Sequence, residues 1–294
     1  MLKTQEKTQD EVMRFMFDNH GVRGEIATLK QSAQALLKDH NYPKAIKALM
    51  LELALTSTLI AATLKANGEV MIQLRGGDNA PLKYALINIS QNLSFYGSAS
   101  LYEGVNLKDD ASLKEIIGDN GVLVISVFPE GGVKWQGIVP IEKDSIQQAL
   151  EEYFEISEQL PSKFFIYTDL EDLEAYGIML QIISGVEGNT QSLEHLGILT
   201  STMTLGEFKE LNSLEILNRL FAEEKVRVFE PRALKFHCVC SKERCQKTLM
   251  SLPRHELEEI CSDEKGTDLN CAHCGKTYHF TQEELKELLL KVSQ

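Results

Sequence analysis

The first 237 residues of this chain contain no cysteine, and all six of its cysteines lie between Cys238 and Cys274. In a reducing compartment, thiols clustered in this way favour metal binding or redox chemistry over a structural disulfide framework. The chain also lacks a Walker loop, a GxSxG motif and an HExxH motif, so none of these signatures supports an enzyme. We therefore expect a protein that is not an enzyme and whose metal-binding or redox chemistry lies near its C-terminus.

The sequence has no excess of basic residues. Its formal net charge is -13, with 30 Lys and Arg against 43 Asp and Glu. Nucleic-acid binding draws its affinity from Lys and Arg, so this balance argues against a nucleic-acid partner. The acidic excess is concentrated between residues 141 and 230, where 18 acidic residues stand against 6 basic ones. This section is either a solvated helical surface or one with a specific electrostatic role, and both interpretations stay open.

Targeting and membrane signals are also missing. The first residues, MLKTQEKTQDEVMRF, are polar and charged where a secretory signal would be apolar. The most apolar stretch, residues 48–64, is short for a membrane span and carries Glu52 with three hydroxyl side chains. A composition of 43% apolar and 25% charged residues is typical of a soluble globular protein. We therefore expect a cytoplasmic protein with no membrane partner.

The first half of the chain has the pattern of an α+β domain. Residues 69–76 and 81–90 have the pattern of two antiparallel strands joined by a loop, and residues 122–128 and 133–141 repeat it. Such hairpins, with long apolar helices nearby, predict a sheet covered by helices.

Other elements of this domain are predicted from local signals. We expect an opening strand at residues 14–19, turn glycines in GVRGE, and a helix from about residue 27 to 38. A long apolar helix is predicted over residues 43–66, with Pro43 at its start. Further strands are expected before residue 185, so the N-terminal domain is assigned to residues 1–185.

Residues 186–235 have a different pattern, of short amphipathic helical pieces separated by Gly and Thr. Short helices are marginal alone and depend on packing against a neighbour. We assign residues 186–235 as a helical linker, a candidate for a region that can separate from the domain. The alternative, that these are simply the last helices of the domain, stays open from the sequence.

Four of the thiols form two close pairs, Cys238-x-Cys240 and Cys271-x-x-Cys274, with thirty residues between them. The second pair continues as CGKTYHF, in which the glycine eases a tight turn that aims backbone N–H groups at sulfur. Two such pairs brought together place four thiolates around a tetrahedral ion, an arrangement typical of zinc. The sequence therefore predicts a small four-cysteine zinc-binding domain at residues 236–294.

The remaining candidates near this site are weaker. Cys245 and Cys261 lie in predicted helices with no partner at ligand spacing, so we expect small buried hydrophobes, with reactivity as the alternative. His273 and His279 could replace a ligand, and His237 could tune its neighbouring thiol. With four thiols available, we expect these histidines at the surface or beside the ligands.

Such a site would be open to oxidation wherever an oxidant has access to its sulfurs, and the sequence does not show that access. Zinc holds its ligands as thiolates, which is the form that oxidants attack. Two thiolates on one ion lie about 3.7 Å apart and a disulfide needs about 2.05 Å, so cysteines one or two residues apart can close the gap by local motion. Structural zinc supplies on the order of 10–16 kcal/mol to a small module. Loss of zinc should therefore unfold residues 236–294 and weaken any neighbour that rests on them.

With these residues in place, the chain resembles the redox-regulated holdase chaperones of the 33 kDa chaperonin (heat shock protein 33) family. The likeness includes RFMFDNHGVRGE, YPKAIKALMLELALTSTLIAATLK, ISEQLPS and AYGIMLQ. It continues through LFAEEKVRVFEPRALKFHCVCSKERC to LNCAHCGKTYHF. The specific part is the Cys-x-Cys with a distant Cys-x-x-Cys, preceded by RVFEP and followed by SKERC.

The resemblance implies a protein that is inactive while reduced and zinc-bound. Peroxide or hypochlorous acid, helped by unfolding stress, would form the disulfides Cys238–Cys240 and Cys271–Cys274 and release zinc. The C-terminal module would then unfold together with residues 186–235, whose short helices fit the family's metastable linker. The exposed apolar surface would bind unfolding client proteins without ATP. The active form would be a homodimer that serves the response to oxidative stress. The additional thiol of Cys261 would also allow other disulfides.

Three other interpretations remain as alternatives. A constitutive structural zinc site on an unrelated enzyme is disfavoured because the N-terminal domain has none of the enzyme motifs named above. A thiol-disulfide oxidoreductase is disfavoured because the Cys-x-x-Cys does not lie at the strand-to-helix junction of a recognisable βαβ unit. A zinc-ribbon nucleic-acid-binding module is disfavoured by charge, because residues 236–294 carry 8 basic and 10 acidic side chains without a basic stripe.

Overall fold

The computed structural model of the chain describes residues 10–64 and 68–292. The chain divides into two compact units, the first ending at Phe236 and the second beginning at His237. The polar start of the chain, residues 1–9, and the predicted helix end at Ala66 lie outside the described residues. The linker boundaries at residues 186 and 235 stay a prediction.

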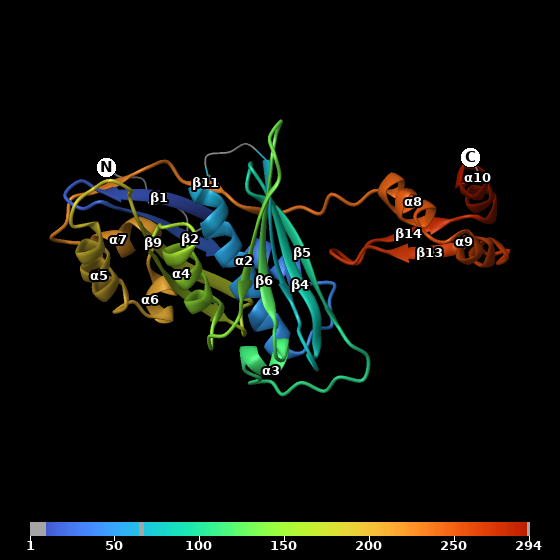
Figure 1. Cartoon of the computed structure of the whole chain (residues 1–294), viewed down its shortest axis with the longest axis horizontal. Helices are drawn as coiled ribbons and strands as arrows, with labels where there is room; N and C mark the ends of the chain where they lie inside the picture. Colours follow the sequence, from blue (N-terminus) through green and yellow to red (C-terminus); the bar gives the residue numbers. More distant parts are fainter. Residues whose placement is uncertain (1–9, 65–67, 293–294) are drawn as a thin grey trace. The chain divides into compact units, whose positions relative to one another are not determined.

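The first unit contains two sheets, of which the first is antiparallel throughout (Figure 1). Its strands are β1 (Glu11–Phe17), β2 (Val22–Leu29), β8 (Ser162–Asp169), β9 (Glu174–Ile182), β10 (Val226–Val228) and β11 (Arg232–Ala233). They run in the order β10-β1-β2-β9-β8, and β11 pairs with the beginning of β1. Strands from the two ends of the first unit's sequence therefore share one sheet.

The expectation for residues 21–38 was wrong in part. Gly24 lies inside β2 and not in a turn, and the strand continues to Leu29, so the helix α1 begins only at Gln31. The glycine is needed because a Cβ at residue 24 would come within 2.1 Å of the Phe15 ring on β1. A strand buried on both faces has no alternating pattern, and periodicity alone does not separate it from a helix.

The second sheet confirms the two predicted hairpins. Its strands are β3 (Gly68–Arg75), β4 (Leu82–Ser90), β5 (Ser94–Leu101), β6 (Val122–Pro129), β7 (Trp135–Pro140) and β12 (Lys235–Phe236). The order is β12-β5-β4-β3-β6-β7, with β12 parallel to β5 and the other neighbours antiparallel. The predicted α+β class with sheet and helices in one domain is confirmed.

The long apolar helix forms the centre of the first unit. The helices up to residue 156 are α1 (Gln31–Leu37), α2 (Lys44–Thr63), α3 (Leu113–Ile117) and α4 (Ile146–Ile156). α2 contacts β2, β8 and β9 of the first sheet and β3 and β4 of the second. By length and composition alone α2 could cross a membrane, but 78% of its most apolar stretch is buried inside the protein. We therefore interpret α2 as a core helix that is buried between the two sheets.

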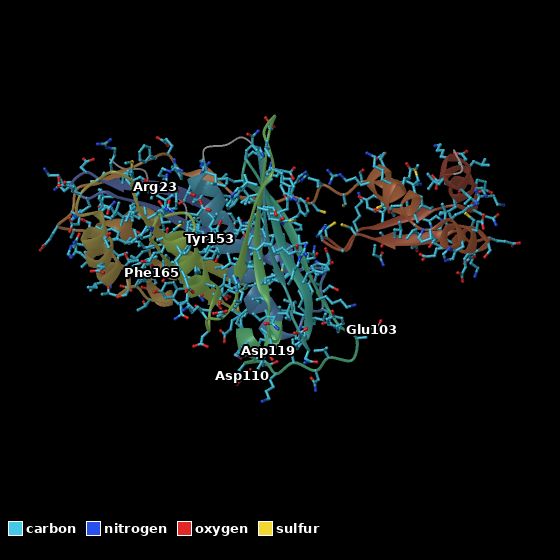
Figure 2. All side chains as sticks on the ribbon, viewed as in Figure 1. Arg23, Glu103, Asp110, Asp119, Tyr153 and Phe165 are labelled. Atoms are coloured by element: carbon cyan, nitrogen blue, oxygen red, sulfur yellow. The ribbon has the colours of Figure 1, made fainter. Side chains whose placement is uncertain are left out.

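Three short helices pack on the first sheet. They are α5 (Asn189–Thr200), α6 (Leu205–Glu210) and α7 (Ser213–Leu220). Their apolar side chains form a cluster with those of β1, β2 and β9, separate from the cluster around α2, and Phe165 of β8 packs at its border (Figure 2). Phe208 of α6 is 1% exposed and lies against the rings of Tyr167 and Tyr176, with centroid distances of 5.2 and 5.6 Å. These helices depend on the sheet for burial.

A histidine–carboxylate cluster fastens the same helices to the sheet. Glu224, which follows α7, accepts hydrogen bonds from His20 in the β1–β2 turn at 2.8 Å and from His195 of α5 at 3.0 Å. His20 also contacts the Ser192 hydroxyl of α5 at 2.9 Å. The hydrogen bonds from His195 and His20 lower the pKa of Glu224. One carboxylate therefore joins three segments that lie far apart in the sequence.

A second polar anchor holds the strand β11. Arg232 of β11 donates a hydrogen bond to the carbonyl oxygen of Ala62 at the end of α2, at 3.2 Å, and Arg14 of β1 donates to the same oxygen. The Arg14 guanidinium also lies 2.6 Å from the carboxylate of Glu25, which is 1% exposed. The chain just before the cysteines is therefore tied to the core by polar contacts and by strands of only two or three residues.

The second unit is small. It consists of α8 (Lys242–Met250), α9 (Arg254–Cys261), β13 (Thr267–Asn270), β14 (Thr277–Phe280) and α10 (Gln282–Val292). Its buried core comprises Leu249, Leu257, Cys261, Tyr278, Phe280, Leu285 and Leu288. A core of this size gives little stability to an isolated module, so a further cross-link such as a bound metal is expected.

Candidate metal centre

Two loops of the second unit carry the four paired cysteines. Cys238 and Cys240 lie in the extended segment before α8, and Cys271 and Cys274 lie in the turn that joins β13 to β14. Both segments lie within the second unit, so the site is built inside one compact body.

The turn around Cys271 and Cys274 is tight, as the CGKTYHF motif predicts. The Gly275 N–H donates to the Cys271 carbonyl oxygen at 2.9 Å, and the Cys271 N–H donates to the Lys276 carbonyl oxygen at 2.9 Å. Gly275 has φ +67°, a left-handed conformation that favours glycine. The turn also aims the His273 N–H at the Cys271 sulfur, at 3.5 Å. Backbone geometry therefore presents the second thiol pair.

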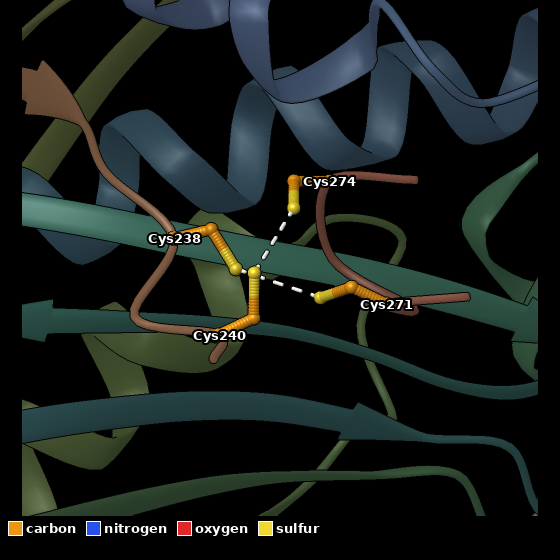
Figure 3. Close-up of side chains that lie close together, drawn as sticks. All are labelled: Cys238, Cys240, Cys271 and Cys274. Carbon is orange, nitrogen blue, oxygen red and sulfur yellow. Dashed lines mark hydrogen bonds between the residues drawn. The ribbon is translucent and has the colours of Figure 1, made fainter. Parts of the chain in front are cut away.

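The four sulfur atoms converge on one point. All four Sγ atoms lie within 4.8 Å of one another, and Figure 3 shows the side chains directed together. The Cys238 and Cys271 sulfurs are 3.6 Å apart, and those of Cys240 and Cys274 are 3.5 Å apart. Around a tetrahedral ion with a metal–sulfur distance near 2.3 Å, sulfur atoms lie about 3.7 Å apart. The donor set and its spacing therefore fit a thiophilic tetrahedral cation.

The electrostatics of the cluster also favour a cation. Burial raises the pKa of Cys238 and Cys274. Burial acts in the same direction on Cys240, but hydrogen bonds from the Tyr278 hydroxyl, at 3.1 Å, and from neighbouring thiols outweigh it and lower that pKa. Four thiolates at such distances would repel one another strongly, so all four sulfurs lose their protons together only around a cation that balances their charge. The arrangement can hold a metal ion.

The other candidates from the sequence lie outside this cluster. Among the described residues, the four paired cysteines are the group of His, Cys, Asp and Glu side chains close enough together to share a metal ion. Cys261 is 6% exposed in the core, and Cys245 of α8 is partly buried against that core. The Nδ1 atom of His279 forms a hydrogen bond with a carboxylate oxygen of Asp268, at 2.7 Å. Sequence reasoning missed Tyr278, although it stands four residues after Cys274 in the same motif.

Comparisons with known proteins agree on one family. The family model described as Hsp33 protein matches residues 10–281. The 33 kDa chaperonin of Edwardsiella ictaluri is 39% identical over 281 residues, covering 95% of this chain and 94% of that protein. The 33 kDa chaperonin of Salmonella typhi is 37% identical with the same coverage.

A solved structure has the same fold. The crystal structure of the 33 kDa chaperonin (heat shock protein 33 homolog) from Thermotoga maritima superimposes with a TM-score of 0.79. The alignment covers 97% of this chain and 100% of that one, at 23% sequence identity. The similarity to this structure therefore concerns the fold alone.

Proposed function

The chain belongs to the Hsp33 family of 33 kDa chaperonins, and on that premise we propose that it is a redox-regulated, ATP-independent holdase and not an enzyme. The reduced, zinc-bound protein is inactive, and oxidation converts it to a form that binds unfolding proteins and prevents their aggregation. The observation that carries this proposal is the convergence of two sequence-local thiol pairs within 4.8 Å of one another.

In the reduced state the four thiolates of Cys238, Cys240, Cys271 and Cys274 bind zinc. When bound, zinc keeps these sulfurs deprotonated and supplies folding free energy on the order of 10–16 kcal/mol. Cys238 and Cys240, before α8, and Cys271 and Cys274, in the β13–β14 turn, would hold the ion together and so cross-link the two segments. This cross-link supports a small core that would be weak by itself.

Oxidation removes the ligands two at a time. One thiolate of a pair attacks the O–O bond of a peroxide, which leaves a sulfenic acid and releases hydroxide. The second thiolate then attacks the sulfenic sulfur, forms the S–S bond and displaces a second hydroxide. Each pair loses two electrons and reduces one peroxide, with two protons converting the hydroxides to water. The disulfides formed are Cys238–Cys240 and Cys271–Cys274.

The consequence of these disulfides is a loss of stability. Each new bond closes a loop of one or two residues, which replaces a long-range cross-link with a local one. A disulfide stabilises a fold by restricting the unfolded chain, and very short loops restrict it little. The second unit therefore unfolds once its metal has left.

Unfolding then extends into the metastable linker. The chain between α7 and the cysteines is held by the strands β10, β11 and β12, of three, two and two residues, together with Arg232 and Glu224. Short strands at the end of a chain segment are the elements that open first. Release of α5 to α7 exposes their apolar faces and the sheet beneath, which supply the surface that binds clients.

The same mechanism bears on the cellular compartment, the oligomeric state and the partners of the protein. A thiol switch of this kind works in the reducing cytoplasm during oxidative stress. The oxidised protein acts as a homodimer, and its partners are unfolded or partly folded proteins. An oxidoreductase function is disfavoured because the Cys271-x-x-Cys274 pair lies in a turn between two strands and not at the start of a helix.

This proposal predicts a difference between two forms of one protein. Peroxide-oxidised protein should suppress the light scattering of a heat-unfolded client, and reduced zinc-loaded protein should leave it unchanged. The matched control is the oxidised sample after reduction with a thiol and addition of zinc, which should lose its activity. Equal suppression by the oxidised and reduced forms would refute redox regulation.

A further inference from the structure

We propose that Tyr278 is a positioning residue of the metal centre, whose hydroxyl group stabilises the Cys240 thiolate and slows the loss of this sulfur from the metal. The inference rests on the proposed zinc-binding function. The hydroxyl donates to the Cys240 sulfur at 3.1 Å, and a hydrogen bond to a charged acceptor is stronger than one to a neutral acceptor.

The position of Tyr278 in the fold fixes this contact. Tyr278 lies in β14, paired with Leu269 of β13, so it belongs to the hairpin whose turn carries Cys271 and Cys274. Its sulfur partner, Cys240, belongs to the other thiol pair. The hydrogen bond therefore joins the two halves of the site independently of the metal.

The ring of Tyr278 is held firmly. The side chain is 9% exposed and contributes to the buried core of the second unit. The Lys276 ammonium lies 5.0 Å from the ring centroid, within the range of a cation–π contact. A rigid ring holds its hydroxyl at a fixed place, so little entropy is lost when the hydrogen bond forms. This geometry separates the role of the ring, which is packing, from the role of the hydroxyl.

The hydroxyl affects both metal binding and oxidation. A hydrogen bond to a thiolate withdraws charge from the sulfur, which lowers its nucleophilicity towards peroxide. Residues that hydrogen-bond to metal ligands typically change metal affinity or activity by 10–100-fold when they are replaced. The Tyr278 hydroxyl therefore raises the peroxide concentration that is needed to oxidise the four-cysteine site.

The test is Tyr278→Phe in the full-length protein, because phenylalanine keeps the ring in the core and removes only the hydroxyl. Zinc release is followed with a colorimetric chelator, with and without peroxide. We expect release about tenfold faster than in the wild type in both conditions. The matched control is Thr277→Val, which removes a neighbouring hydroxyl of β14 that bonds to Asn270 at 2.7 Å, and its rate should equal that of the wild type.

A spectroscopic measurement separates this role from a structural one. With cobalt(II) in place of zinc, the sulfur-to-cobalt charge-transfer band should move to longer wavelength in Tyr278→Phe, because the Cys240 lone pair rises in energy. The band should stay unchanged in Thr277→Val. Wild-type release rates, or faster release with an unmoved band, would overturn the inference and leave the holdase proposal intact. A wild-type protein that binds no zinc would instead refute the proposed function.

Discussion

Replacing Cys271 and Cys274 together by serine should reduce the zinc content from one ion per chain to none and unfold the second unit. Two remaining thiols cannot complete a tetrahedral site, so a metal contribution on the order of 10–16 kcal/mol is lost. The core of seven buried side chains cannot replace a contribution of that size. Metal analysis gives the stoichiometry, and amide hydrogen exchange shows which unit has opened.

The control for this experiment is Cys245→Ser. It also removes a thiol from the second unit, but from α8 and outside the group of converging sulfurs. This variant should keep one zinc per chain and a protected second unit. If the Cys271 and Cys274 double variant retained the metal content of the wild type, the assignment of these ligands would be wrong.

The second large effect is expected for Phe208→Ala. The Phe208 ring is 1% exposed and lies between α6 and the first sheet, against Tyr167 and Tyr176. Removing a buried phenylalanine side chain costs about 3–5 kcal/mol, which a helix of six residues cannot recover elsewhere. We expect α5 to α7 to leave the sheet while zinc stays bound, so the reduced protein should suppress client aggregation without an oxidant.

Hydrogen exchange on residues 189–221 and light scattering of a heat-unfolded client measure the two parts of this prediction. The control is Ile198→Ala in α5, which truncates a side chain that is 69% exposed and should change neither measurement. A Phe208→Ala protein with an open helical segment and no holdase activity would show that release of this segment is not the activating step.

The cluster of four cysteines could be predicted because its signal lies in the local spacing of the chain. The spacing within each thiol pair and the glycine after Cys274 are read directly from the chain, and the structure brings the four sulfurs together as expected. Tyr278 and the His20–Glu224–His195 cluster could not be predicted in the same way. Their partners are set by strand register and helix packing over long separations, for which single residues give no signal.

In the fold, too, the elements with a clear local sequence pattern could be predicted, and those that depend on distant parts of the chain could not. Two hairpins and a long apolar helix have clear patterns, and they form β3–β4, β6–β7 and α2. The strand β2 was mistaken in part for a helix because both of its faces are buried. The strands β10 to β12 are too short to have a pattern, and their pairing depends on strands more than 130 residues earlier in the chain.

The most direct test of the account is a disulfide map of the peroxide-treated protein combined with a zinc count. The central claim is that oxidation joins neighbouring cysteines and thereby releases the metal and opens the second unit. Distance alone does not impose this pairing, because sulfur atoms of different loops also lie close together. The Cys238 and Cys271 sulfurs are 3.6 Å apart, and the Cys240 and Cys274 sulfurs are 3.5 Å apart. Bonds between those partners would fasten the two loops together.

We predict that mass spectrometry will find Cys238–Cys240 and Cys271–Cys274, with one zinc ion released per chain. Peptides linked as Cys238–Cys271 and Cys240–Cys274, or zinc retained by fully oxidised protein, would contradict the account, because the second unit would then remain closed.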